Sequence, residues 1–156
     1  LKTTNNLDYN ILANGIVAYR KVRAGFLEPY PRVLEVLYKL KSKNLKLAIV
    51  SDAPRLKAYL RLASMKLTNF FDIVVTFEDT KTLKPSTKPF KVALKQLKLK
   101  PEQCLMVGDR PERDIKGAKK LGIKTCFARY GNIKVGKVDS DFEINSIQEI
   151  LEIFTP

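Results

Sequence analysis

The chain has 156 residues, a formal net charge of +13 and no histidine. This length suffices for one domain with its own core, and the hydrophobic fraction of 45% excludes a disordered tail. The lack of histidine excludes every mechanism that needs a histidine base or metal ligand. No apolar run approaches the roughly 18 residues that span a bilayer, and the cysteines lack CxxC spacing, which favours free thiols and a cytoplasmic protein.

The positive charge is spread along nearly every expected helix rather than gathered in one block. A basic surface attracts phosphorylated metabolites and nucleic acids alike. Because aromatic residues are not interleaved with the lysines, nucleic-acid binding is the weaker interpretation. Solvated, lysine-rich helix faces, which are common in heat-adapted proteins, explain the charge better.

The first elements of the chain are expected to be helical. Residues 8–22 carry apolar side chains at helical spacing, although an Asn-Gly pair at 14–15 weakens the pattern. A proline-rich breaker at residues 28–31 follows, and Pro31 suits the first turn of a second helix. The expected apolar face of this second helix consists of Val33, Leu34, Leu37 and Leu40.

From residue 45 onward, strands and helices alternate. The apolar run LKLAIV (residues 45–50) predicts a strand, and a helix is expected from near Pro54. The same order recurs, with strands expected at residues 70–77, 104–108, 124–131 (with a loop at its end) and 141–144. Further helices are expected at residues 89–99, 111–121 and 146–154. This order predicts an open, doubly wound (Rossmann-like) α/β domain whose parallel sheet is covered on both faces.

Polar residues follow these strands where such folds bind ligands, at the carboxyl ends. Taken alone, Ser51 could be a helix N-cap, Lys84 is one lysine among many, and Asp114 could complement a helix N-terminus. Asp109 is different, because a carboxylate directly after a buried strand is costly unless a cation meets it. Together with Asp52, these residues predict an anion site. A hydroxyl and a helix N-terminus would hold phosphate, a lysine would neutralise charge, and a carboxylate would hold Mg²⁺.

These stretches resemble a known family. Ser51 after a strand, KPSTKPF with Lys84, and VGDRPERDIKGAKKLG are similar to the second, third and fourth motifs of the haloacid dehalogenase superfamily. The resemblance is to the phosphatase-like branch with a small helical cap, and it covers the chain from about residue 30 to its end. It implies that residues 1–28 are the last part of the cap. Residues 29–156 are then the α/β core without its first strand.

The resemblance also implies roles for single residues. Ser51 and the Asp52 amide bind the phosphoryl group of the substrate. Lys84 is catalytic and pairs with the nucleophile and the transferring phosphate. Asp109 is catalytic and binds Mg²⁺, and Asp114 is placed beside it at the metal.

The family's first motif, a strand that ends in Asp-x-Asp, has no counterpart in this chain. Asp139-Ser140-Asp141 has the letters, but it follows a polar loop and precedes a strand. In the family the missing strand lies between those expected here at residues 45–50 and 104–108. The missing N-terminal segment is therefore the expected partner, and the absence of Met at Leu1 agrees with a fragment.

The expected function is that of a Mg²⁺-dependent phosphomonoester hydrolase. It would act on a small metabolite through an aspartyl-phosphate and be inactive as this chain alone. One alternative is a 2-haloacid dehalogenase, although that branch usually has Ser-Asn-type residues where this chain has Gly108-Asp109. Another alternative is a non-catalytic phosphate-binding module.

Overall fold

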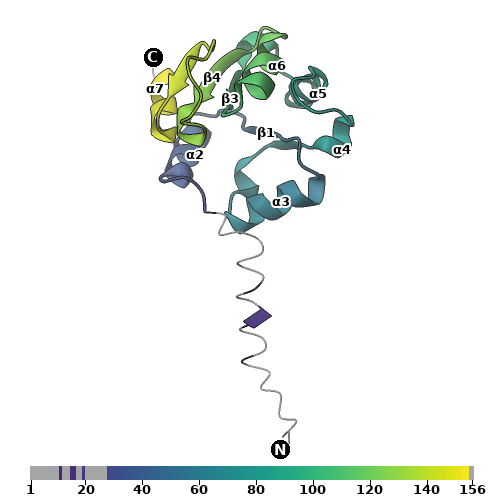
Figure 1. Ribbon diagram of the computed structural model, residues 1–156, viewed down its shortest axis with the longest axis vertical. Helices are drawn as coiled ribbons and strands as arrows, with labels where there is room; N and C mark the ends of the chain where they lie inside the picture. Colours follow the sequence, from purple (N-terminus) through teal and green to yellow (C-terminus); the bar gives the residue numbers. More distant parts are fainter. Residues whose placement is uncertain (1–10, 12–14, 17–18, 20–27, 155–156) are drawn as a thin grey trace, which may run out of the picture.

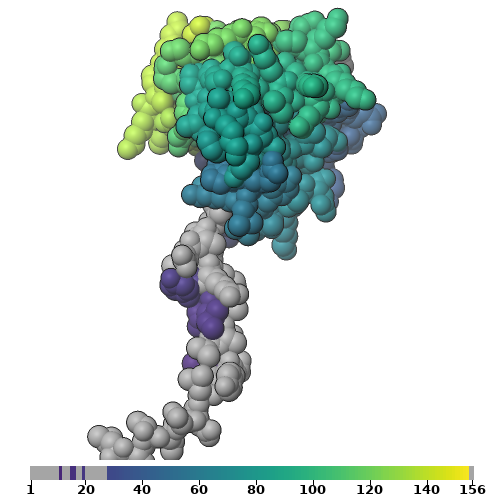
Figure 2. All heavy atoms as spheres, turned by 90° about the vertical axis from the view of Figure 1, so that its right-hand side faces the viewer, coloured from purple at the N-terminus to yellow at the C-terminus, as the bar shows by residue number. Residues whose placement is uncertain are grey.

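Strands and helices alternate along the chain in the computed structural model, in the order that the sequence predicts (Figure 1). The structure describes residues 11, 15–16, 19 and 28–154, and residues 28–154 form one rounded body (Figure 2). The helix expected at residues 8–22 and the cap assigned to residues 1–28 fall largely outside the described residues and stay predictions. None of the helices that the structure describes is long and apolar enough to cross a membrane.

The elements are short and begin and end close to the predicted residues. The helices are α2 (Val33–Ser42), α3 (Arg55–Ser64), α4 (Phe77–Thr80), α5 (Lys88–Leu97), α6 (Lys116–Lys119) and α7 (Ile150–Ile153). The strands are β1 (Ala48–Val50), β2 (Ile73–Val75), β3 (Leu105–Gly108), β4 (Lys124–Ala128) and β5 (Phe142–Ile144). The helix predicted at residues 111–121 begins as a π-helix, Pro111–Ile115, before it becomes α6.

All strand pairs are parallel, but they form two sheets rather than one. β1 pairs with β2, with Ile49 opposite Val74. The second sheet has the order β3-β4-β5, with Val107 opposite Cys126. The parallel α/β class is therefore confirmed, and no ladder joins β1 to β3 within the described part of the chain.

Helices cover both faces of the three-stranded sheet and hold the two sheets together. α2 and α7 pack on one face through Val36, Leu40 and Ile150, whereas α5 and α6 pack on the other through Phe90 and Ala118 (Figure 1). Each large apolar side chain buried in this way contributes about 1.5–3 kcal/mol. α2 also belongs to the core over β1 and β2 through Leu37, so this helix bridges the two sheets.

Two expectations about single residues were wrong. Leu34 was placed on the buried face of α2, but it is 39% exposed, whereas Val36 is fully buried. The buried face of α2 is rotated around the helix axis relative to the predicted face, because α2 packs against the cores of both sheets. Phe77 was expected to end a strand, but it begins α4, because Thr76 and Asp79 form a capping box there.

Candidate active site

Lys84 is the centre of the candidate site. It lies in the loop between α4 and α5, and its ammonium Nζ donates to the Val50 carbonyl at the end of β1, at 2.8 Å. The same Nζ lies 2.6 Å from Asp114 Oδ1, and the two side chains are only 10% and 7% exposed. Separating the partners of such a buried ion pair would leave each charge uncompensated, which is costly. The pair therefore holds both side chains in place.

Asp52 secures the backbone of the same loop. Its Oδ1 accepts the Lys84 backbone N–H at 2.9 Å, and its Oδ2 forms an ion pair with Arg113. The sequence prediction gave Asp52 only an amide role and did not identify Arg113. The carboxylate of Asp52 therefore joins the end of β1 to the Lys84 loop and to the π-helix.

Ser51 follows β1 directly, and its backbone N–H donates to the Val75 carbonyl of β2 at 2.8 Å. Its hydroxyl accepts the Ala53 N–H at 3.1 Å. The N-cap of α3 is Pro54, without a side-chain cap bond, so Ser51 does not serve as that cap. Since a hydroxyl both accepts and donates, Ser51 keeps a proton to donate to an anion.

Asp114 is held close to the end of β3 by the absence of a side chain at Gly108. A Cβ at Gly108 would lie 2.5 Å from the Cβ of Asp114. Asp114 Oδ2 also accepts the Arg110 backbone N–H at 3.2 Å. The π-helix that carries Asp114 is a form frequently found at functional sites.

Asp109 packs against the turn after β4, which the sequence prediction did not include in the site. A Cβ at Gly131 would lie 2.7 Å from the Cβ of Asp109, and Asn132 Nδ2 donates to the Asp109 carbonyl at 3.2 Å. Tyr130 lies in the same turn, and burial raises its pKa to about 12, with a smaller contribution from Asp109. The sequence signal that could have identified this turn is Tyr-Gly-Asn (residues 130–132), because it follows a strand that ends at the same edge of the sheet.

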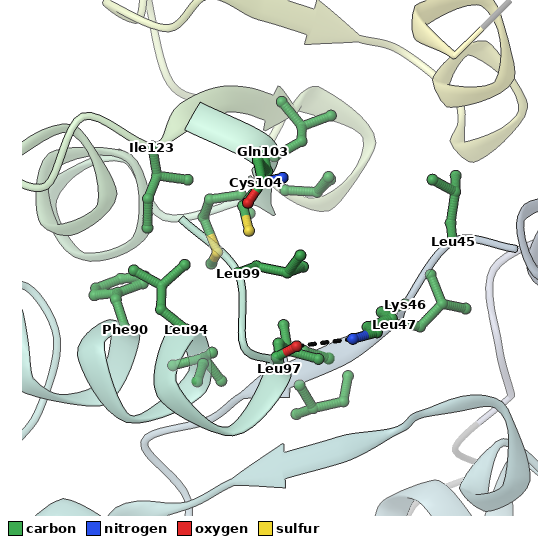
Figure 3. Close-up of a pocket in the computed structure, with 18 of the residues that line it drawn as sticks. Leu45, Lys46, Leu47, Phe90, Leu94, Leu97, Leu99, Gln103, Cys104 and Ile123 are labelled. Atoms are coloured by element: carbon green, nitrogen blue, oxygen red, sulfur yellow. Dashed lines mark hydrogen bonds between the residues drawn. The ribbon is translucent and has the colours of Figure 1, made fainter. Parts of the chain in front are cut away.

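A cavity of about 600 Å³ separates β1 from β3 (Figure 3). Its walls are mainly apolar, and Lys84, Asp109 and Asp114 line it together with Val50 and Gly108 from the ends of β1 and β3. Three of the predicted site residues thus share one cavity, and Asp52 contacts Lys84 from beside it. Among the described residues, no group of three or more Asp, Glu, Cys or His side chains could hold a metal ion.

The chain is similar to known proteins over most of its length. The family model described as haloacid dehalogenase-like hydrolase matches residues 5–128. The glyceraldehyde 3-phosphate phosphatase of Methanocaldococcus jannaschii is 38% identical over 148 residues, which are 94% of this chain and 65% of that protein. The chain thus spans less than two thirds of that relative.

Two solved structures have similar folds. A HAD phosphatase from Thermococcus onnurineus superposes with a TM-score of 0.76 at 31% identity, over 80% of this chain and 57% of that one. The HAD-hydrolase YfnB from Bacillus subtilis, solved bound to magnesium, has a TM-score of 0.71 at 26% identity, over 80% of this chain and 54% of that one.

Proposed function

The chain belongs to the haloacid dehalogenase-like hydrolases, and from this premise we propose that it is the larger part of a Mg²⁺-dependent phosphomonoester hydrolase. The proposed substrate is a small phosphorylated metabolite, because the relative from Methanocaldococcus jannaschii is named for one. The observation that carries the proposal is the Lys84–Asp114 pair, which lines the cavity together with Asp109.

Lys84 is positioned to stabilise negative charge. A lysine ammonium has three N–H donors, and its contacts with Val50 and Asp114 engage part of that capacity. The remaining donor capacity can meet a phosphoryl oxygen, with the Ser51 hydroxyl and the Asp52 amide beside it. Fixed donors of this kind, aimed at charge that develops in the transition state, typically supply a large part of the catalysis.

Asp109 and Asp114 are the proposed metal ligands. Mg²⁺ is usually held by one or two carboxylates, water and substrate phosphates, so these two acids fit the ion in donor type. When bound, the ion neutralises charge on the phosphoryl oxygens. In the chain itself, Asp114 orients Lys84 through their ion pair, and Asp109 lines the cavity beside them.

The nucleophile is proposed to come from a segment with an Asp-x-Asp sequence, outside the residues that the structure describes. Its first carboxylate attacks phosphorus, and the ester oxygen leaves with a proton from the second Asp. Water then attacks the aspartyl-phosphate, which releases phosphate and restores the carboxylate. Under this proposal the present chain supplies the lysine, the metal ligands and the phosphate-binding turn.

The test is to express the chain alone and the chain extended upstream of Leu1 in its natural reading frame. Both products are assayed for hydrolysis of p-nitrophenyl phosphate with and without Mg²⁺. We expect turnover only from the extended protein, and only with Mg²⁺. Lys84→Ala should lower its rate by roughly a hundredfold or more, and Asp109→Ala should nearly abolish turnover.

Lys88→Ala is the matched control, because Lys88 is exposed at the start of α5 and should have little effect. A larger loss from Lys88→Ala than from Lys84→Ala would contradict the assignment of the lysine. Turnover by the unextended chain that disappears on Asp109→Asn would contradict the proposal that the nucleophile comes from another segment. Release of halide from a 2-haloacid, without phosphate release, would favour the dehalogenase alternative.

A further inference from the structure

The positive charge of the chain is concentrated on one side of the structure. Residues 81–140 contain 16 lysines and arginines and five acids, so they carry +11 of the total charge of +13. Residues 141–154, which include β5 and α7, contain four acids and no basic residue. Because α5 and α7 lie on opposite sides of the molecule (Figure 1), the side that carries α5 and α6 is strongly basic. Anions are attracted to such a surface.

A second cavity, of about 610 Å³, lies on this side between the π-helix with α6 and the loop that joins β4 to β5. Four lysines line it, and we call it the lysine cavity. Lys116, Lys119 and Lys120 come from α6 and its end, and Lys137 comes from the loop. The lysine cavity shares no lining residue with the cavity between β1 and β3, so the two can be filled independently.

Two of these lysines have acidic partners, but both ion pairs are weak. Lys116 Nζ lies 3.2 Å from Glu112 Oε2, and Lys119 Nζ lies 2.6 Å from Asp139 Oδ1. The two carboxylate side chains are 84% and 95% exposed, and ion pairs in such exposed positions contribute little to stability. A phosphate group that enters the cavity can therefore replace either carboxylate at small cost.

The other two lysines, Lys120 and Lys137, have no carboxylate partner in the part of the chain that the structure describes. They come from two different segments and line the same cavity, where their like charges repel each other unless an anion lies between them. In contrast, Lys88, Lys91 and Lys95 of α5 are exposed and line neither cavity, so solvation alone explains them. The convergence of lysines on one cavity, rather than their number, indicates an anion site.

The charge and size of the lysine cavity favour a small anion with more than one phosphate group. Lysine binds phosphate as a point charge, and one phosphate group carries about −2 at pH 7. A single phosphate would leave about half of the lysine charge unmatched once both carboxylates turn to solvent, whereas two or three linked phosphates match it. The volume lies within the roughly 300–1,000 Å³ of small-molecule sites, which favours a small molecule over a nucleic acid.

We propose that the lysine cavity binds a small molecule that carries two or three linked phosphate groups. The phosphate oxygens accept hydrogen bonds from the four lysines, and a nucleoside attached to them packs on apolar wall residues such as Val135. The site adjoins the other cavity through the π-helix, since Ile115 lines the lysine cavity and Asp114 lines the other. No residue of the lysine cavity takes part in the proposed phosphoryl transfer, so this site goes beyond the proposed function.

The probe is inorganic tripolyphosphate, titrated calorimetrically into the full chain at about 0.15 M salt without divalent metal ions. We expect saturable binding, and orthophosphate should bind at least about tenfold more weakly because it offers less charge. Replacing both unpaired lysines, Lys120→Gln with Lys137→Gln, should weaken the binding of tripolyphosphate at least about tenfold, because it removes two charged hydrogen-bond donors. Lys120→Arg with Lys137→Arg keeps the charge and should retain most of the affinity.

The matched control is Lys91→Gln with Lys95→Gln, which removes the same charge from α5 outside the lysine cavity. Salt screens the interaction between a bound anion and distant exposed charges, so this control should change the affinity by less than about twofold. All four lysines are exposed, so both double variants should fold, and their melting temperatures without ligand check this. Surface substitutions of this kind rarely destabilise a protein.

Titration with ATP distinguishes the two sources of linked phosphates. A higher affinity for ATP than for tripolyphosphate would support a nucleoside polyphosphate as the ligand, and an equal or lower affinity would support an inorganic chain. Three results would overturn the site: unchanged affinity in the Lys120 and Lys137 double variant, an equal loss in the Lys91 and Lys95 control, or binding that disappears only on Lys84→Ala. Because the titration measures no turnover, its failure is distinguishable from a failed phosphatase assay.

Discussion

At the scale of single residues, the site depends on positions that carry no side chain. Gly108 and Gly131 each leave room for one aspartate, and both have a negative φ, in contrast to Gly122 at +75°. Their importance therefore lies in close approach rather than in backbone freedom. Glycine at such positions lets neighbouring groups come closer than any Cβ permits.

Gly108→Ala should destabilise the chain and disturb the Lys84–Asp114 pair. The new Cβ would meet the Cβ of Asp114 at 2.5 Å, and this atom cannot move without the π-helix. Overpacking of this kind costs about 1–3 kcal/mol, which urea unfolding can measure. Gly136→Ala is the control, because nothing lies within 4 Å of the position that a Cβ would take there, and it should stay within about 0.5 kcal/mol of the parent. Equal stability of the two variants would contradict the close packing of Asp114.

At the scale of elements, short helices depend on their caps. α4 has only four residues, which is too few for a helix to be stable by itself. Its Asp79 Oδ2 accepts the Thr76 N–H and the Thr76 hydroxyl, each at 2.7 Å. The hydroxyl of Thr76 holds the pKa of Asp79 below its ordinary value, with further contributions from the Thr76 backbone and Arg55.

Asp79→Ala should cost about 1 kcal/mol of unfolding free energy near pH 7, as for the loss of other helix caps. Because the folded-state pKa is depressed, the stabilisation is present above the unfolded value near 4 and is lost as pH falls through the folded value. The difference between Asp79→Ala and the parent should therefore shrink below about pH 4, which chemical denaturation at several pH values can measure. Arg55→Ala should matter less, because the Arg55 side chain is 55% exposed. A difference that persists unchanged in acid would contradict the role of the carboxylate.

At the scale of the whole molecule, the cavity between the two sheets should make one of the two cysteines more reactive than the other. Both cysteines are free, as the sequence predicts, but only Cys126 is fully buried, whereas Cys104 is partly exposed and lines the cavity. Burial raises the pKa of Cys126 to about 11, with smaller effects from Glu149 and Glu143. Burial and Glu102 also raise the pKa of Cys104.

Near pH 8, a thiol reagent should modify Cys104 at least about tenfold faster than Cys126, because Cys126 is almost entirely protonated and reacts only when the chain unfolds. Mass spectrometry of the labelled chain can follow both sites, and Cys104→Ser isolates the slow one. In urea the two rates should converge. Equal rates in the folded chain would indicate that β4 is as accessible as the cavity.

The order of the elements could be predicted from the sequence because each strand and helix has its own local pattern. Runs such as LKLAIV and the turn residues after them define strands that end at polar groups. Ser51, Lys84, Asp109 and Asp114 were expected at one sheet edge for the same reason, since the carboxyl ends of parallel strands meet there, and Lys84, Asp109 and Asp114 do line one cavity, while their roles stay predictions. That the family's strand ending in Asp-x-Asp is missing from this chain stays a prediction, made from the resemblance and not from a local pattern.

Only the tertiary structure decided which groups join these residues. Arg113 reaches Asp52, and Gly131 approaches Asp109, across separations of 61 and 22 residues, which no local pattern reports. The same holds for Leu34, since the buried face of α2 depends on the two sheets that it bridges. The family resemblance implied a gap between β1 and β3, but which neighbour satisfies the backbone of a strand is a tertiary property, because the strand's own sequence records only that it is apolar.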